Sequence, residues 1–257
     1  MLNFRNTNIF FITLLVVLIG IHINYDLPVY IYPLVLVAYS LIVFYSCYYV
    51  GSNFFIKIIC SADTSRKEIA ISFDDGPAIN HTPEILQLLQ QDNIKATFFC
   101  IGNRIAGNEN ILRQIKEDGH IIGNHSYSHH FWFDMFSSKK MLEDLRMMDE
   151  ELKRVTGLQP KLFRPPYGVT NPNLKKAIVA GNYTPVGWSV RSMDTVIKDE
   201  KKLLDKINRS ITPGAVFLFH DTSATTLHVL PAFIKEVKNS GYQIIPLDKL
   251  LHLTPYA

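Results

Sequence analysis

The stretch ISFDDGP, residues 71–77, places two adjacent carboxylates directly after an apolar run and just before a Gly-Pro turn. The preceding residues, Glu68–Phe73, predict a buried strand, so Asp74 and Asp75 follow its end. Side chains at the carboxyl ends of parallel strands commonly form active sites in β/α folds. A plain turn is the alternative, because Asp-Gly-Pro is good turn chemistry.

The chain from Lys67 onward reads as a series of β/α units. Short β-branched or aromatic runs alternate with amphipathic stretches, the pattern of a parallel sheet covered by helices. The predicted strands are Glu68–Phe73, Lys95–Cys100, His120–Gly123, Lys161–Phe163, Tyr183–Trp188, Ala215–Phe219 and Gln243–Pro246. The predicted helices are Thr82–Gln91, Asn110–Asp118, Ser138–Val155, Asn173–Ala180, Lys201–Ser210 and Thr226–Asn239.

Polar side chains at strand ends decide between an open sheet and a barrel. They follow five of the predicted strands, as Asp74-Asp75, His125 and His129, Arg164–Gly168, Asp194, and His220-Asp221. A TIM-type barrel gathers the carboxyl ends of its strands at one mouth, where residues from many strands form a single site. We therefore predict an α/β fold of the TIM-like (β/α)-barrel type.

Two apolar segments precede these units. Residues 29–50 carry no charged side chain and are long enough to cross the bilayer core, which takes ~20 residues of helix. Residues 9–23 are shorter and, taken alone, would also suit a signal-peptide core. We predict a transmembrane hairpin turning at Asn24–Pro28, with two buried helices of a soluble core as the alternative. The chain then divides into a membrane anchor, residues 1–60, and a catalytic domain, residues 61–257.

The charged residues and the cysteines limit the possible partners and the membrane topology. Arg5 precedes the first segment and Lys57, Arg66 and Lys67 follow the second, so the positive-inside rule puts both ends of the hairpin in the cytoplasm. The net charge of +3 comes without a Lys/Arg block, which argues against a nucleic-acid partner. Three cysteines without a C-x-x-C spacing predict free, mostly buried thiols. The oligomeric state stays open.

His125 and His129 predict a metal site. An i, i+4 pair lies on one face of a helical turn, so both imidazoles can bind one cation, with Asp75 or Asp74 as third ligand. Such a set, with open positions for water and substrate, suits zinc, and cobalt or nickel also fit. One carboxylate would bind the metal while its neighbour takes a proton from the attacking water. Solvated surface histidines are the alternative.

Two further motifs carry polar groups to strand ends. Arg164–Gly168 (RPPYG) is a stiffened loop that can hold Arg164 against a carboxylate and point an amide at a developing oxyanion. His220 ends an apolar strand and suits a general acid that protonates a leaving amine. An ordinary rigid loop and a core histidine are the respective alternatives.

The four motifs together resemble one family. Residues 73–77 (FDDGP), 125–129 (HSYSH), 164–168 (RPPYG) and 218–221 (LFHD), in this order, are similar to those of the polysaccharide deacetylases, carbohydrate esterase family four with its NodB homology domain. The resemblance covers about residues 66–250. It implies a distorted (β/α) barrel and metal-dependent hydrolysis of N-acetyl groups on a sugar.

The resemblance also implies roles for single residues. Asp74 would be the base, oriented by Arg164, and His220 would be the acid. The metal ligands would be Asp75, His125 and His129. The Tyr167 amide would help to hold the oxyanion. The substrate-binding residues would be Leu218, which would line the acetyl pocket, Trp188 and Pro165.

One family motif departs from its usual form. Asp-x-x-Asp-Trp here reads Arg191-Ser-Met-Asp194-Thr195, so the carboxylate that tunes the acid histidine is kept as Asp194. The first Asp has become Arg and the Trp has become Thr, which changes the cleft around the sugar and bears on the substrate more than on the reaction.

We thus predict a membrane-anchored, metal-dependent deacetylase acting on N-acetylglucosamine units of a peptidoglycan- or chitin-like glycan. Alternatives are a C–N hydrolase acting on a small non-sugar amide and a non-catalytic glycan-binding barrel. An enzyme acting on an envelope glycan should face outward, whereas the charges favour a cytoplasmic catalytic domain. The side of the membrane therefore stays open.

Overall fold

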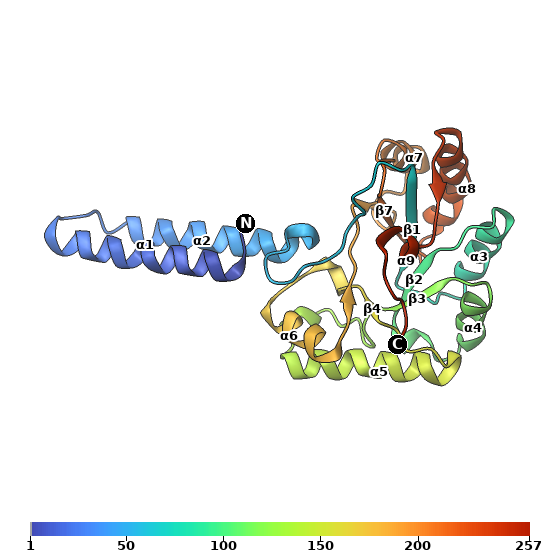
Figure 1. Cartoon of the computed structure of the whole chain (residues 1–257), viewed down its shortest axis with the longest axis horizontal. Helices are drawn as coiled ribbons and strands as arrows, with labels where there is room; N and C mark the ends of the chain where they lie inside the picture. The colour runs from blue at the N-terminus through green and yellow to red at the C-terminus, as the bar shows by residue number, and fades with distance from the viewer. Residues whose placement is uncertain (1) are drawn as a thin grey trace.

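The computed structural model describes residues 2–257 and shows a curled sheet of eight parallel strands surrounded by helices (Figure 1). The strands are β1 (Glu68–Asp74), β2 (Thr97–Cys100), β3 (Ile121–Asn124), β4 (Leu162–Phe163), β5 (Thr184–Pro185), β6 (Val190–Arg191), β7 (Val216–His220) and β8 (Gln243–Ile244). Their order is β5-β4-β3-β2-β1-β7-β6, and β8 pairs with the beginning of β1. The predicted distorted (β/α) barrel is confirmed.

The barrel is distorted because the chain crosses the gap between its edge strands. The predicted single strand Tyr183–Trp188 is wrong: β5 ends at Pro185 and β6 begins at Val190, on opposite edges of the sheet. Pro185 has no amide hydrogen to continue the pairing. Ile59 lies in the gap, where its amide donates to the Pro185 carbonyl (3.1 Å) and its carbonyl accepts from Gly187 (2.9 Å).

Six of the helices match the predicted ones to within about two residues. They are α3 (Thr82–Gln91), α4 (Glu109–Glu117), α5 (Ser138–Thr156), α6 (Pro172–Gly181), α7 (Glu200–Asn208) and α8 (Ala224–Asn239). The capping residues at the two ends of α5 show why its bounds were predictable. The Ser137 hydroxyl accepts from the Lys140 amide, and Gly157 ends the helix at φ 73°. A short helix that was not predicted, α9 (Leu247–Leu251), packs against the barrel interior.

Alternation along β1 separates the core from the site. Ile69, Ile71 and Phe73 face outward into the core formed with the surrounding helices. Ala70 faces inward, with the side chains that fill the barrel. The next inward positions on β1 are Ser72 and Asp74, both buried, so the polar end of this face lies at the barrel mouth.

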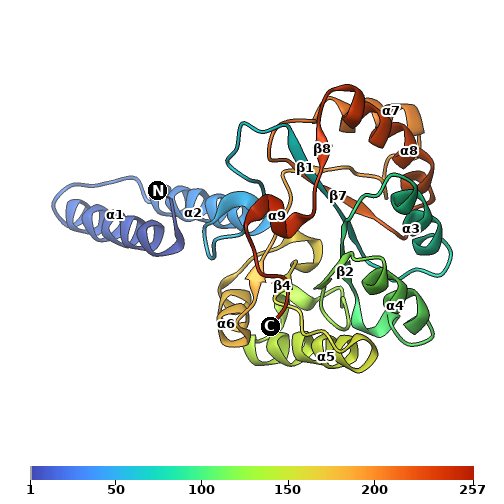
Figure 2. The same cartoon turned by 45° about the vertical axis from the view of Figure 1, so that its right-hand side comes forward.

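The N-terminal helices α1 (Phe4–Asn24) and α2 (Ile31–Tyr48) form a hairpin that projects from the barrel in both views (Figures 1 and 2). Both helices are long and apolar enough to cross a membrane, and only 11% and 6% of their apolar windows are buried. Such exposure argues against the soluble-core alternative. Membrane insertion and the boundary at residues 60/61 stay predictions.

Hydrogen bonds hold the hairpin to the segment that follows it and to the barrel. At the start of α1 the Phe4 amide donates to the Phe54 carbonyl (3.0 Å). At the end of α2 the Cys47 carbonyl accepts from the Thr170 amide (3.0 Å). All three cysteines are free, but only Cys100 is fully buried, so the expected burial of the thiols holds for one of the three.

Candidate active site

Strand register places Asp74 beside His220. β1 and β7 are parallel neighbours in which Ser72 pairs with Leu218 and Asp74 with His220. Paired residues on adjacent strands lie about 4.8 Å apart and point to the same face. Leu218 is buried and faces the barrel interior next to the two polar positions.

Arg164 holds Asp74 in a fully buried ion pair. Its guanidinium donates to Asp74 Oδ1 at 2.7 Å and to the Ser72 hydroxyl at 2.8 Å. Two carbonyls, of Val186 (3.3 Å) and Gly187 (2.7 Å), accept its remaining hydrogens. Four of the five guanidinium hydrogens thus have acceptors. The other oxygen of Asp74, Oδ2, lies 3.8 Å from His125 Nε2, on the side of the histidines.

Asp75 joins the two histidines. Its Oδ1 lies 3.5 Å from His125 Nε2 and 3.4 Å from His129 Nε2, and one ligand atom from each residue falls within 4.8 Å of the others. Asp75 has φ 75°, in the left-handed region, which turns its side chain away from the direction taken by Asp74. The adjacent carboxylates therefore diverge, one toward Arg164 and one toward the imidazoles.

The histidines do not lie on a helical turn, so that part of the prediction is wrong. Residues 125–129 form an irregular loop in which Ser126 (φ 67°) and His129 (φ 42°) are left-handed. The loop is held by its own polar groups: the Ser126 amide donates to Asn124 Oδ1 (2.8 Å), and the His129 amide to the Ser126 hydroxyl (3.0 Å). Loop curvature, rather than helical pitch, brings both rings to Asp75.

The donor set fits a divalent metal. His125 Nδ1 lies 2.8 Å from the Arg164 carbonyl, which only accepts, so the proton is on Nδ1 and Nε2 offers its lone pair toward Asp75. Burial lowers the pKa of His129 to about 4, which favours the neutral ring that a metal ligand must offer. Two imidazoles and one carboxylate suit zinc, cobalt or nickel.

His220 and Asp194 form a second buried pair. His220 Nδ1 lies 2.8 Å from Asp194 Oδ1, and the His220 amide donates to Asp194 Oδ2 (2.6 Å). Burial opposes the charge on each partner, but their mutual attraction outweighs it: the pKa of His220 is raised and that of Asp194 lowered. The Thr226 hydroxyl also donates to Asp194. The pairing thus favours the protonated form of His220, in which Nε2 carries a hydrogen that it can donate.

Replacing Asp194 with Asn should shift the pH profile. Without the carboxylate charge the pKa of His220 falls, so the protonated acid is lost at a lower pH. We expect the alkaline limb of the kcat–pH profile to move to lower pH. The matched control is Asp199→Asn at the exposed N-cap of α7, where Asn caps equally well. An alkaline limb that stays in place in Asp194→Asn would remove His220 as the titrating acid.

The loop after β4 forms one wall of the mouth. Tyr167 is left-handed (φ 59°) and its ring lies 4.8 Å from that of His129. Gly168 (φ 74°) is required here, since a Cβ would come within 2.6 Å of the Trp188 ring. Trp188 in turn lies 5.7 Å from the Arg164 guanidinium. Pro165, which is buried, begins the turn that carries Tyr167.

One positioning residue, Asp144, was missed in the sequence, and Asp221, which the sequence placed at a strand end, was given no role there. Asp144, on the inner face of α5, accepts from the Tyr127 (2.8 Å) and Ser128 (3.3 Å) amides and so holds the histidine loop. An acid on the apolar stripe of an amphipathic helix was the available signal. Asp221 is buried, accepts from the Thr82 hydroxyl (2.6 Å), and has its pKa raised to about 7 by burial.

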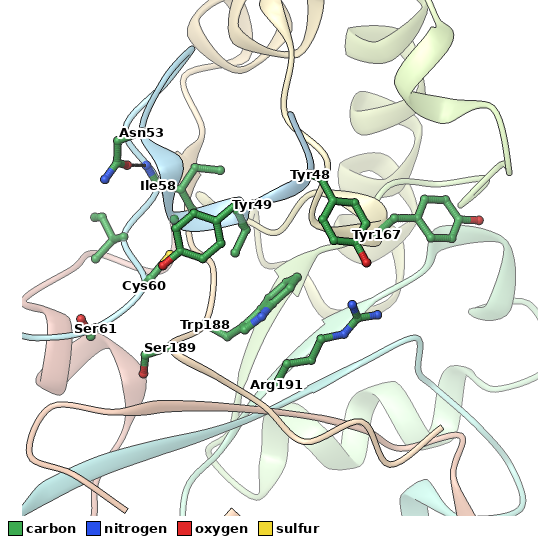
Figure 3. Close-up of a pocket in the computed structure, with 13 residues that line it drawn as sticks. Tyr48, Tyr49, Asn53, Ile58, Cys60, Ser61, Tyr167, Trp188, Ser189 and Arg191 are labelled. Atoms are coloured by element: carbon green, nitrogen blue, oxygen red, sulfur yellow. Dashed lines mark hydrogen bonds between the residues drawn. The ribbon is translucent and has the colours of Figure 1, made fainter. Parts of the chain in front are cut away.

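Beside the mouth lies a pocket of about 580 Å³ (Figure 3). Tyr167 and Trp188 line it on the side of the catalytic residues, and Arg191, which stands where the family motif has Asp, is exposed within it. The structure therefore brings the predicted catalytic and ligand residues together at one mouth and places the departing position in the adjoining pocket.

Known proteins are similar to this chain in sequence and fold. Residues 61–186 match the family model described as polysaccharide deacetylase. Peptidoglycan-N-acetylglucosamine deacetylase of Bacillus cereus is 34% identical over 199 residues, which are 74% of this chain and 70% of that protein. PdaA, a peptidoglycan-N-acetylmuramic acid deacetylase of Bacillus subtilis, is 31% identical over 82% of this chain and 78% of its own length. A crystal structure of a peptidoglycan N-acetylglucosamine deacetylase in complex with a substituted benzamide superposes with TM-score 0.74 at 30% identity, covering 78% of this chain and 95% of that one. The chain belongs to the polysaccharide deacetylase family.

Proposed function

We propose that this protein is a metal-dependent deacetylase that hydrolyses N-acetyl groups of N-acetylglucosamine units in a peptidoglycan-like glycan, giving free amine and acetate. The observation that carries the proposal is the convergence of three parts at one mouth. Asp74 is held by Arg164 at 2.7 Å, the Asp75–histidine cluster lies beside it, and His220 pairs with Asp74 in register.

The chain's own residues supply proton transfer and orientation. When bound by Asp75 and the two histidines, the metal supplies Lewis-acid polarisation of the acetyl carbonyl and lowers the pKa of water. Asp74 accepts a proton from the attacking water as the water oxygen bonds to the acetyl carbon. The Tyr167 amide donates to the developing oxyanion. His220 then gives its Nε2 proton to the nitrogen as the C–N bond breaks.

The names of the relatives support peptidoglycan ahead of a chitin-like glycan, since both curated relatives are named for peptidoglycan. The altered Arg191 and Thr195 positions favour keeping a small non-sugar amide as the second candidate substrate. A non-catalytic glycan-binding barrel is disfavoured, because competent side chains fill the base, acid and ligand positions. We propose further that α1 and α2 anchor the enzyme in the cell membrane.

Acetate release tests the proposal. We expect the full chain in detergent to release acetate from N-acetylglucosamine oligomers, to lose this activity on chelation, and to regain it with Zn²⁺, Co²⁺ or Ni²⁺. Acetanilide serves as the small amide. Release from acetanilide alone would move the substrate to the second candidate. A folded protein that binds one metal ion and hydrolyses neither compound would support the binding barrel instead.

A further inference from the structure

The pocket beside the catalytic mouth is built partly from the membrane hairpin. One wall is the end of α2 and the turn that follows it, through Tyr48, Tyr49 and Val50. The opposite wall comes from the barrel, through Trp188 and Arg191. In Figure 3 the Tyr48 ring and the Arg191 guanidinium face the same open space beside Trp188. Because Tyr48 ends a helix that fits a membrane span, the pocket would lie at the depth of the lipid headgroups once α2 is inserted as proposed above.

An exposed apolar loop continues this face. Phe131, Trp132 and Met135 are exposed by 69%, 58% and 72%. The loop is tied to the same region, since Asn171 donates to the Asp134 carbonyl (2.7 Å) while the neighbouring Thr170 amide donates to the end of α2. Aromatic side chains of this kind partition to the bilayer interface. Two sets of side chains that favour the bilayer interface therefore border the catalytic mouth: the tyrosines at the end of α2 and the residues of this loop.

The charge in the pocket selects an anion. Among the 13 described residues that line it, Arg191 alone carries a full charge. The pocket thus offers one cation and no carboxylate, whereas the usual family motif has an Asp at this position. A guanidinium is well matched to phosphate, which it can bind with two parallel hydrogen bonds.

We propose, building on the deacetylase function above, that the substrate is a glycan still attached to a membrane lipid through a phosphate. The sugar would reach the catalytic mouth past Tyr167 and Trp188, and the linking phosphate would contact Arg191 between the barrel and the end of α2. This assignment also reconciles the flanking charges, which favour a cytoplasmic catalytic domain, with an envelope glycan, because the glycan would be deacetylated on its lipid carrier at the cytoplasmic face.

The test compares three substrates that carry the same N-acetylglucosamine. They are an isoprenoid phosphate-linked sugar in phosphatidylcholine vesicles, a neutral isoprenoid glycoside in the same vesicles, and a soluble oligomer. With the full chain reconstituted, we expect kcat/KM to be at least about tenfold higher on the phosphate-linked sugar than on the neutral glycoside, from one charge-assisted contact. Arg191→Gln should reduce that ratio about tenfold, mainly through KM. Arg209→Gln, at the exposed arginine that follows the end of α7, is the matched control.

A binding measurement separates this inference from the deacetylase function. In the chelated protein, tryptophan fluorescence should report binding of the phosphate-linked lipid at lower concentration than the neutral one, and Arg191→Gln should abolish the difference. Equal kcat/KM for all three substrates would overturn the inference and leave the deacetylase standing. Preference for the phosphate-linked lipid that survives Arg191→Gln would equally overturn it. Selective binding without any hydrolysis would support the site while sinking the catalytic proposal.

Discussion

Asp74→Asn should lower kcat for acetate release about 10³-fold, the usual scale for losing a positioned general base. An Asn amide is nearly the same size as the carboxylate but cannot take the proton of the attacking water. The metal content should stay near one ion per chain, because Asp75, rather than Asp74, lies between both histidines. Steady-state kinetics on N-acetylglucosamine oligomers and metal analysis of the same sample check both expectations.

Folding must be followed in the same variant. Arg164 loses its carboxylate partner but keeps the Ser72 hydroxyl and the Val186 and Gly187 carbonyls as acceptors. We therefore expect the fold to persist at somewhat lower stability. Asp63→Asn, at an exposed site, is the matched charge-removing control. Wild-type kcat in Asp74→Asn would reject Asp74 as the base, and concurrent metal loss would make it a ligand.

Arg164→Met should produce the largest loss of stability. The methionine keeps much of the side-chain volume, but the variant leaves Asp74 buried with no cation beside it, which costs about 3–5 kcal/mol. For a chain of this size that loss corresponds to a Tm lowered by roughly 10 °C. Thermal unfolding followed by circular dichroism in detergent measures the change.

A double variant distinguishes the unpaired charge from lost packing. Adding Asp74→Asn to Arg164→Met removes the stranded charge, so part of the lost stability should return. Arg154→Met, at an exposed pair with Glu151, is the control and should leave Tm nearly unchanged. If the double variant is as unstable as the sum of the two single ones, Arg164 stabilises the barrel by contacts independent of Asp74.

The barrel and the members of its site were predictable because they depend on local signals. The apolar alternation of β1 and the polar residues at strand ends are visible in the sequence, and strand register then brings Asp74 to His220. The broken strand at Pro185 was not predictable in the same way. Residues 183–188 have strand composition, and their division follows from closure against Ile59, which lies over 120 positions away in the chain.

The geometry of the metal cluster could not be predicted from the sequence either. Spacing alone placed His125 and His129 on a helix, whereas left-handed Ser126 and His129 make a loop instead. That loop is held by Asp144, which lies on another element, α5, and accepts a hydrogen bond from a backbone amide of the loop. The sequence left Asp74 and Asp75 interchangeable as ligands. The positive φ of Asp75 separates them in space, with Asp75 at the histidines and Asp74 at Arg164.

The insertion of Ile59 into the barrel gap has a consequence for how the enzyme would search for substrate. A catalytic domain on a flexible linker explores a volume, because its linker allows it to tilt and to rise from the surface. Here about ten residues separate the end of α2 from a backbone pairing inside the barrel, and Thr170 fixes the same junction from the other side. With α1 and α2 in a bilayer, the mouth would be held at one height and one tilt. Encounters would then depend on lateral diffusion in two dimensions, and the enzyme's reach would be set by the geometry of a single junction.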